Sequence, residues 1–439
     1  MKKPNFLFLL PDQFRSDWLG FKHEVPVTTP NLDTLAKQGT VFNNAYTPSP
    51  LCAPARACLA SGRDYGKCGV INNSQNYPLD LPTYYQSLRD SGYNVAGVGK
   101  FDLHKDTSDA NNLYWGLDGS HLLEDWGFTH GIDNEGKIDG VVSYTHNDKT
   151  PRGPYLKYLA DRGLADKHVE SFMNRKGKEA FTSPLPDEAY CDNWVAENGL
   201  EILKAIGSEK PWHMVVNFTG PHDPMEATEK MRENWHDADL PLPHDIRDLD
   251  PAIELEKRRN YAAMIENIDR QIGRYINYLK ETGQYENTII IFSSDHGEML
   301  GDHGRHGKVS WYEASAGIPL IISGPGIQQG VTSDALVELH DLAATMIDYA
   351  NAEKLPDMEA KSLRPLLSGK CHEHRDFVRS AIYFKHLHWD LIFDGRYKYV
   401  LDHDEEILYD LQTDPQEMHN IIDENKEIAG KLAKMLPTD

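Results

Sequence analysis

The chain has 439 residues, of which 40% are hydrophobic and 26% are charged, and its formal net charge is −23. This composition is ordinary for a large globular protein and too apolar for a disordered one. So strong an acidic excess disfavours a general nucleic-acid binder and a protein held on an anionic membrane surface. We therefore expect neither nucleic acid nor a membrane among its partners, although a local basic pocket is compatible with the overall charge.

The amino terminus reads MKKPNFLFLLPDQ, in which two lysines precede a short apolar run. The run Phe6–Leu10 is too short for the hydrophobic part of a signal peptide, and Pro11 follows it without a small-residue cleavage site. We interpret the run as a buried strand and expect a cytoplasmic protein, or a periplasmic or secreted one if a signal has been removed. The five cysteines are few and odd in number, which disfavours a disulfide framework.

Several apolar runs along the chain have the length and β-branched content of buried parallel strands. Helical patterns lie between them, and the clearest is Pro251–Thr282, where hydrophobic residues repeat about every 3.6 positions. A shorter helix is expected over Asn31–Gln38. Alternating strands and helices predict an α/β fold in which helices cover both faces of a mostly parallel sheet. The expected strands are Asn5–Leu10, Tyr93–Val98, His213–Phe218, Thr288–Ser293 and Pro319–Ser323.

Two regions depart from this alternation. Residues 102–190 are polar and weakly periodic, and we interpret them as a long insertion that helps to shape a substrate cleft. Residues 380–402 have the pattern of antiparallel strands that turn at Asp394-Gly395. We therefore expect a catalytic domain over residues 1–350 and a smaller C-terminal α+β subdomain, with an antiparallel sheet, over residues 351–439.

Polar residues follow four of the expected strands, at the positions where open α/β sheets bind ligands. Carboxylate and amide oxygens together with an imidazole suit a divalent ion such as Ca²⁺, Mg²⁺ or Mn²⁺. Lysines, arginines and histidines nearby in the sequence would suit an oxyanion. Alternatively, the two aspartates only cap the helices that follow them. The metal candidates are Asp12, Gln13, Asp295 and His296, and the basic residues are Lys100, His104, His222, Arg305, His306 and Lys308.

One segment, residues 29–63, resembles the amino-terminal signature of the type I sulfatases, which belong to the alkaline-phosphatase-like superfamily. Its core is Cys52-Ala53-Pro54-Ala55-Arg56, followed by Gly62-Arg63. Asn267–Glu298 and Leu408–Leu411 resemble later blocks of the same family. The resemblance implies a mixed, mostly parallel sheet sandwiched by helices. It also implies that a maturation enzyme oxidises Cys52 to Cα-formylglycine during synthesis.

The resemblance implies a role for each site residue. A hydrate of the formylglycine at Cys52 would attack sulfur, and Cys52 would join Asp12, Gln13, Asp295 and His296 around one metal ion. Arg56 would hold the hydrate, Lys100 and Lys308 would bind sulfate oxygens, and Lys308 or His222 would protonate the leaving alcohol. His104 resembles the histidine that takes a proton from the second hydroxyl, and Asn73 lies near the position of a further oxyanion contact.

The sequence departs from many sulfatases at two positions and in one spacing. Gln13 replaces an aspartate and His296 replaces an asparagine, as in the related phosphonate monoester hydrolases. One ligand charge is therefore lost and one ligand is nitrogen, which weakens the preference for Ca²⁺ and favours entry of Mn²⁺. Ca²⁺ is still the first expectation. The interval from Lys100 to His104 is longer than the common one.

These observations leave three functional hypotheses. The first is hydrolysis of a sulfate monoester, either a small molecule or a saccharide. The second is hydrolysis of a phosphonate monoester or a phosphodiester with the same nucleophile, and the third is an unconverted, inactive anion-binding protein. His386, His388 and Trp389 are candidates for a sugar subsite or for core residues at a sheet edge. Assembly into homo-oligomers is compatible with the sequence.

Overall fold

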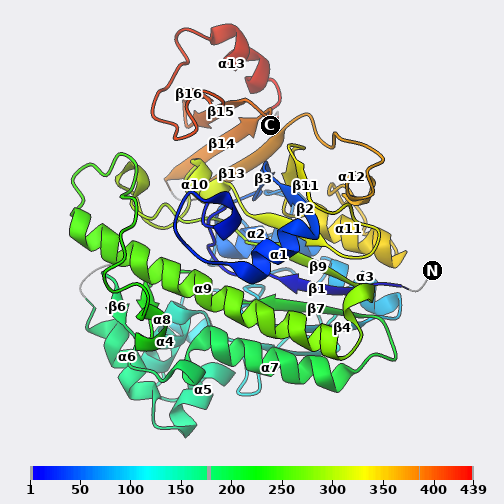
Figure 1. Ribbon diagram of the computed structural model, residues 1–439, viewed down its shortest axis with the longest axis vertical. Coiled ribbons are helices and arrows are strands. Elements are labelled where there is room, and N and C mark those ends of the chain that lie inside the picture. Colours follow the sequence, from blue (N-terminus) through cyan, green and yellow to red (C-terminus); the bar gives the residue numbers. More distant parts are fainter. Residues whose placement is uncertain (1–2, 176–178, 385, 438–439) are drawn as a thin grey trace.

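The structure, a computed structural model, describes residues 3–175, 179–384 and 386–437. An eight-stranded sheet lies at its centre, with helices on both faces and a smaller sheet at one end (Figure 1). The strand order is β11-β2-β10-β9-β1-β7-β4-β5. In chain order the strands are β1 (Asn5–Leu9), β2 (Gly39–Phe42), β4 (Asn94–Gly99), β5 (His130–Asp133), β7 (Trp212–Asn217), β9 (Thr288–Ser293), β10 (Leu320–Ser323) and β11 (Val331–Ser333).

The middle of the sheet confirms the expected parallel arrangement. Strand β1 pairs in parallel with β7 on one side and β9 on the other, and β4 pairs in parallel with β7. The carboxyl ends of these four strands therefore meet at one edge. The expectation of a parallel strand at Pro319–Ser323 is wrong, because β10 runs antiparallel to both β9 and β2. The connection from β9 to β10 contains only loops and short helical turns, so the chain returns in the opposite direction.

Helices cover both faces of the sheet, and the side chains of β1 alternate between the two cores. Leu7 and Leu9 pack with one helical layer, whereas Phe6 and Phe8 pack with the other. Asp250 accepts a hydrogen bond from the backbone N–H of Ala252 and so caps the long helix α9. The first layer holds α1 (Pro30–Lys37), α7 (Cys191–Ile206) and α9 (Pro251–Glu281), and the second holds α2 (Cys52–Ser61), α3 (Tyr84–Asp90) and α11 (Asp341–Ala350).

The segment 102–190 contributes to the main sheet as well as to the surface. Its strand β5 pairs in parallel with β4 and forms one edge of the sheet. Helices from the same segment pack on the α7 side of the sheet, at the lower left in Figure 1. These helices are α4 (Lys137–His146), α5 (Pro154–Asp161) and α6 (Ala165–Met173), and the short strand β6 (Phe181–Thr182) pairs with β8 (Glu226–Ala227).

A four-stranded antiparallel sheet in the C-terminal part confirms the pattern expected there. Its strands are β13 (Val378–Phe384), β14 (Leu387–Phe393), β15 (Tyr397–Asp402) and β16 (Glu405–Asp410), and the β14–β15 turn lies at Asp394-Gly395. Helix α13 (Lys426–Ala433) packs on this sheet. The sheet also shares a hydrophobic core with the main unit, because Trp389, Leu51 and Met299 belong to one cluster of buried residues. The remaining elements are β3 (Ala45–Tyr46), β12 (Val337–Glu338), α8 (Glu229–Arg232), α10 (Glu313–Ala316) and α12 (Arg364–Leu367).

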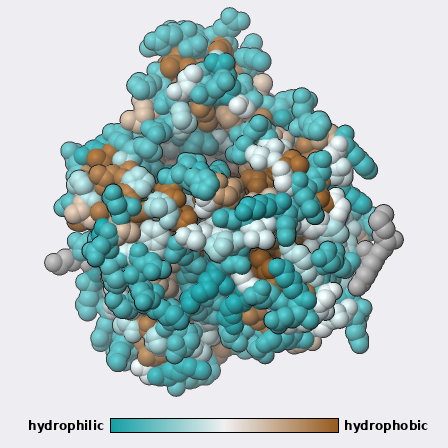
Figure 2. Space-filling model, in the orientation of Figure 1, coloured by the Kyte–Doolittle hydropathy of each residue, from teal (hydrophilic) through white to brown (hydrophobic). Residues whose placement is uncertain are grey.

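The surface agrees with the acidic composition. Figure 2 shows a largely hydrophilic face on which hydrophobic residues form small, separate patches. Within the described residues, no helix has both the length and the apolar character needed to cross a bilayer.

Candidate active site

The candidate site forms where the four central parallel strands end. Asp12 and Gln13 follow β1, Lys100 follows β4 and Asp295 follows β9. His222 lies on the loop after β7, and an isolated parallel bridge joins Asp12 to Pro221 of that loop. Neighbouring strands in a sheet lie about 5 Å apart, so residues that follow them are held close together.

Cys52 enters this edge from the helical layer above the sheet. It is the first residue of α2, where backbone N–H groups lack partners within the helix and give the helix end a partial positive charge. Asn73 accepts a hydrogen bond from the Ala53 N–H at 3.0 Å, so the contact of Asn73 is with the helix end that presents Cys52. Helix α2 thus delivers its first side chain to the strand ends.

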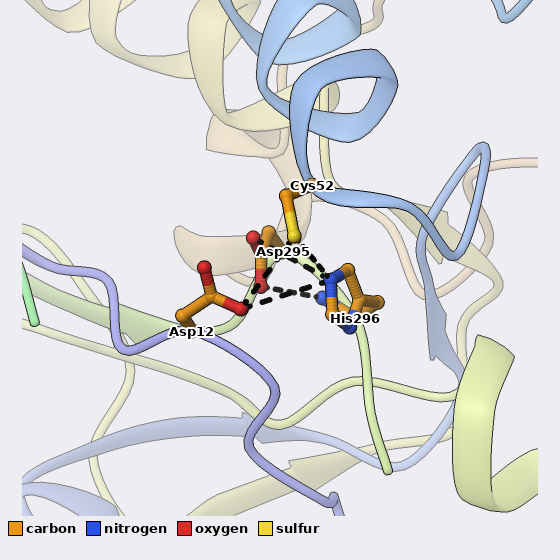
Figure 3. A group of neighbouring side chains, drawn as sticks. All are labelled: Asp12, Cys52, Asp295 and His296. Carbon is orange, nitrogen blue, oxygen red and sulfur yellow. Dashed lines mark hydrogen bonds and ion pairs between the residues drawn. The ribbon is translucent and has the colours of Figure 1, made fainter. Parts of the chain in front are cut away.

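Four side chains of types that bind metals converge at this point, and we call them the metal-donor group: Asp12, Cys52, Asp295 and His296 (Figure 3). One ligand atom from each lies within 4.8 Å of the others, and all four residues are buried. Cys52 Sγ lies 3.3 Å from His296 Nε2 and 3.8 Å from Asp12 Oδ1. The His296 Nδ1–H donates to the Gly297 carbonyl at 3.0 Å, which leaves the lone pair of Nε2 facing the group.

Arg56 and Lys100 balance the buried carboxylates. The Arg56 guanidinium donates to Asp295 Oδ2 at 2.9 Å and to Asp12 Oδ2 at 3.4 Å. Lys100 Nζ also donates to Asp12 Oδ2. Because these donors occupy Oδ2 of Asp12, the other oxygen, Oδ1, faces Cys52 and His296. The carboxylate thus keeps one oxygen directed at the centre of the group.

Lys308 approaches Cys52 from the side that is more open to solvent. Its ammonium donates to Cys52 Sγ and to Gln13 Oε1, both at 2.9 Å, and to His222 Nε2 at 2.7 Å. The other ring nitrogen of His222 donates to the Asp223 carbonyl, so Nε2 is free to accept. Gln13, Cys52, His222 and Lys308 therefore form one hydrogen-bonded set.

Charge around Cys52 changes the protonation of the site. Burial raises the pKa of the Cys52 thiol, but the positive charges of Lys100, Lys308 and Lys105 outweigh burial and lower the pKa well below its usual range. Burial also raises the pKa of Asp12, and the neighbouring lysines hold it well below the ordinary value of an aspartate. The site is therefore built to hold negative charge at Cys52.

His104 is one of the predicted site residues that the structure places apart from Cys52. Its ring packs edge-to-face on His121 at 4.9 Å, and in the described part of the chain no hydrogen bond or ion pair joins it to Cys52. Burial lowers its pKa, as does the neighbouring His121. Arg305 and His306 also lie outside the site, because Arg305 lies over the Trp311 ring and His306 bonds Glu254 at 2.8 Å. The other predicted site residues contact the metal-donor group, Lys308 or the start of α2.

Three charged residues beside Lys100 were not predicted from the sequence, namely Asp102, Lys105 and Asp139. A single oxygen, Oδ2 of Asp102, accepts from Lys100 Nζ at 3.1 Å and from Lys105 Nζ at 2.7 Å. Lys105 also pairs with Asp139, on the first turn of α4, at 3.1 Å. Lys100, Asp102 and Lys105 are all buried. The signal in the sequence that could have identified Asp102 and Lys105 is the pattern Lys-x-Asp-x-x-Lys, over residues 100–105, directly after a strand.

Glu298 is a further residue whose role was not foreseen. Its carboxylate accepts from the Gln13 side-chain amide and from the Gly307 N–H, the latter at 2.6 Å. It thereby orients Gln13 with its oxygen toward Lys308, and it holds the loop that carries Lys308.

Comparison with known proteins now defines the family. The sulfatase family model matches residues 4–352, and the model described as N-sulphoglucosamine sulphohydrolase, C-terminal, matches residues 301–438. An arylsulfatase of Clostridium perfringens is 29% identical over 476 residues, which cover 99% of this chain and 94% of that protein. A choline-sulfatase of Rhizobium meliloti is 30% identical over 455 residues, which cover 95% of this chain and 82% of that protein.

A solved structure agrees with these relatives on the fold. The crystal structure of a phosphonate monoester hydrolase of Agrobacterium radiobacter matches with a TM-score of 0.81 at 23% identity, over 98% of this chain and 94% of that one. The chain therefore belongs to the sulfatase family and has the alkaline-phosphatase-like fold. It is an enzyme of that family, as the resemblance in residues 29–63 predicted.

Proposed function

We propose that this enzyme hydrolyses a sulfate monoester through a formylglycine made from Cys52, with one divalent cation. The observation that carries the proposal is the meeting of Cys52 with two carboxylates, an imidazole and the Lys308 ammonium at a buried point. A cysteine that only fills space has no use for these charges, since structural buried thiols are inert and neutral. Residues 52–56 also keep the Cys-x-Pro-x-Arg pattern of the family.

The residues present fit a divalent cation. Asp12 Oδ1 and His296 Nε2 direct lone pairs to a common centre, and Asp295 adds a second carboxylate. The Gln13 amide oxygen lies on the Lys308 side of that centre. This set of oxygens with one imidazole suits Ca²⁺ first and Mn²⁺ or Mg²⁺ as alternatives. Bound there, the cation would lower the pKa of a hydroxyl nucleophile and neutralise the ester anion.

The modified Cys52 would supply the nucleophile. Its hydrate would supply a hydroxyl that attacks sulfur and a second hydroxyl whose proton loss allows sulfate to leave by C–O cleavage. The side chains around it have separate tasks. Arg56 holds the Asp12 and Asp295 carboxylates in place, so that their charge stays directed at the centre.

Lys100 and Lys308 would bind the sulfate oxygens from two sides of Cys52. Lys308 is well placed to stabilise charge that develops in the transition state, because its ammonium already contacts Cys52 Sγ. His222 Nε2 accepts a hydrogen bond from Lys308, so the pair can deliver a proton to the leaving alcohol. Asn73 holds the first turn of α2 with its N–H groups toward the anion.

The proposal is tested by linking conversion of Cys52 to activity. The protein is produced together with a formylglycine-generating enzyme, and the peptide covering residues 49–63 is analysed by mass spectrometry. Aryl sulfate, choline sulfate and monosaccharide sulfates are then assayed for sulfate release. We expect activity in proportion to the converted fraction, and loss of activity on chelation of the metal. Fully converted, metal-loaded protein that releases no sulfate from any of these esters would contradict the proposal.

A second candidate function is hydrolysis of a phosphonate monoester, and two observations favour it. Gln13 and His296 occupy positions where many sulfatases have aspartate and asparagine, a pattern that resembles that of the phosphonate monoester hydrolases. The fold also matches the crystal structure of one such hydrolase with a TM-score of 0.81. An aryl phosphonate monoester is therefore assayed beside the aryl sulfate. A higher kcat/KM for the phosphonate would reverse the order of the two functions.

A further inference from the structure

The loop that carries Lys308 is held at both neighbouring residues. On one side, the Gly307 N–H donates to Glu298 Oε1 at 2.6 Å. On the other side, the Val309 N–H donates to the Pro50 carbonyl at 3.1 Å, two residues before Cys52. The Val309 carbonyl in turn accepts from the indole N–H of Trp389 at 3.3 Å. Lys308 thus lies between two fixed points, one in the main unit and one shared with the C-terminal sheet.

Val309 has an unfavourable backbone conformation. Its φ is 63°, in the left-handed region, which β-branched residues rarely adopt. A residue keeps such a conformation only where surrounding contacts impose it, and such residues concentrate at functional sites. Both backbone polar groups of Val309 are engaged, one by Pro50 and the other by Trp389. These two hydrogen bonds fix the backbone of Val309, and its side chain packs against the hydrophobic cluster that contains Trp389.

Trp389 is itself firmly placed. It lies on β14 with 1% of its surface exposed, and its ring meets Trp311 edge-to-face at 6.1 Å. The neighbouring strand β13 contacts the segment that leads into Cys52, because the Ala381 N–H donates to the Pro48 carbonyl at 3.1 Å. The C-terminal sheet therefore touches both the segment that leads into Cys52 and the residue that follows Lys308.

We propose that Trp389 is a positioning residue for Lys308, so that the C-terminal sheet is a working part of the active site. Its indole N–H fixes the Val309 carbonyl, and the strained turn at Val309 directs the Lys308 ammonium toward Gln13, Cys52 and His222. Without that N–H, Val309 relaxes to a negative φ and Lys308 leaves the anion. This inference depends on the proposed role of Lys308 in anion binding. It also assigns Trp389 a role other than a sugar subsite, which its burial disfavours.

The test removes one N–H group and keeps an aromatic ring. Trp389→Phe is compared with Trp212→Phe, which loses an indole N–H bonded to Gln284 Oε1 at 2.9 Å in an equally buried position. Trp212 is the first residue of β7, so it lies at the amino end of that strand, whereas the site lies beyond the carboxyl ends of the strands. We expect Trp389→Phe to lower kcat/KM about tenfold or more, since small displacements of an aligned group have large kinetic effects. Trp212→Phe should keep kcat/KM within about twofold of the parent.

A second variant separates positioning from general damage. Glycine adopts positive φ readily, so Val309→Gly removes the strain that the Trp389 hydrogen bond opposes. We expect the double variant Trp389→Phe, Val309→Gly to recover a substantial part of the lost kcat/KM. If the double variant is no better than Trp389→Phe, strain at Val309 is not the means of positioning and the proposal fails.

An activity-independent measurement distinguishes failure of this inference from failure of the proposed function. Hydrogen exchange of the peptide covering residues 306–312 is followed by mass spectrometry in unconverted protein. We expect faster exchange in Trp389→Phe, because the Val309 N–H loses its fixed geometry, and unchanged exchange in Trp212→Phe. Unchanged exchange in both variants would overturn the inference, whether or not the enzyme releases sulfate. Faster exchange without any sulfatase activity in the parent would count against the proposed function alone.

Discussion

Among the residues that the structure describes, two groups of side chains have the composition of a metal site, yet their surroundings differ. The first is the metal-donor group at the strand ends. The second, which we call the capping group, consists of Asp64, Glu338 and His340, whose ligand atoms also lie within 4.8 Å of one another. It lies at the start of α11, where His340 directly precedes the helix.

In the capping group the polar atoms are already paired with one another and with an arginine. His340 Nε2 donates to Asp64 at 3.1 Å, and Arg375 pairs with Glu338 at 3.3 Å and with Asp341. The other nitrogen of His340, Nδ1, has no hydrogen-bond partner among the described residues. The imidazole uses its proton on Asp64, so the nitrogen that faces the carboxylates carries a hydrogen and not a free lone pair.

In the metal-donor group the backbone sets the opposite arrangement. The Gly297 carbonyl takes the Nδ1 proton of His296, and Arg56 and Lys100 take Oδ2 of Asp12. Lone pairs of Nε2 and Oδ1 therefore remain directed at the centre. The two groups therefore differ in the direction of their unused lone pairs, although ligand types lie equally close together in both. The direction of the lone pairs is what identifies a metal site.

The largest expected effect concerns the cysteine that the capping group lacks. We expect Cys52→Ala to lower sulfate-ester turnover to the limit of detection, since the nucleophile is lost, while the free energy of unfolding falls by only about 1 kcal/mol. Turnover and thermal unfolding are measured in parallel. The matched control is Cys58→Ala, a buried cysteine on the same helix, which should keep turnover. If Cys52→Ala unfolds the protein and Cys58→Ala does not, a packing role for Cys52 gains support.

We expect the bound metal to depend on the metal-donor group and not on the capping group. We expect Asp295→Ala to lose both the bound divalent ion and activity, because one of two carboxylate ligands is removed. The variant Glu338→Gln should keep the same metal-to-protein ratio as the parent. The ratio is measured by elemental analysis after dialysis. An Asp295→Ala protein that retains metal and full activity would show that the ligand assignment is incorrect, and loss of metal from Glu338→Gln would transfer the assignment to the capping group.

A smaller effect is expected for the residues beside Lys100. Lys105 lies close enough to contribute positive charge at Cys52, whereas His104 packs on His121. We expect Lys105→Met to raise KM for the sulfate ester by about tenfold, with a smaller change for His104→Ala. Steady-state kinetics at constant ionic strength measure both. Loss of kcat in His104→Ala with little change in Lys105→Met would instead support the base role that the sequence resemblance implies for His104.

The smallest effect concerns pH and the capping group. Burial lowers the pKa of His340, but Asp64, Glu338 and Asp341 outweigh burial and raise it above the ordinary value of 6.5. His340 therefore contributes stability that is fully present below about pH 6.5 and is lost as the pH rises through the raised folded-state pKa. We expect the Tm to fall by a few degrees above that pH, and His340→Gln to flatten this dependence. The variant His372→Gln, at an exposed position, is the control. A parent Tm that stays constant across this range would contradict the assignment.

Much of the fold could be predicted from local patterns. The apolar runs that became β1, β4, β7 and β9 are buried on both faces, and such strands read as continuous hydrophobic segments. The period of α9 and the turn at Asp394-Gly395 were equally clear. The residues after the four strands could be grouped because parallel strands end at one edge. Local patterns were therefore sufficient to predict the fold class and to name the four residues of the metal-donor group, whereas the role of Cys52 is still a prediction.

The arrangement of the connecting segments could be seen only in the tertiary structure. In that structure β10 is antiparallel to β9, and β5 from the polar segment 102–190 is an edge strand. Lys105, and not His104, shares the Asp102 carboxylate with Lys100. The fold also brings Trp389 of the C-terminal sheet to Val309. Hydrophobic periodicity records which residues are buried, but the direction of a loop side chain depends on partners distant in the chain, such as Asp139 for Lys105. Those partners are known only once the chain has folded.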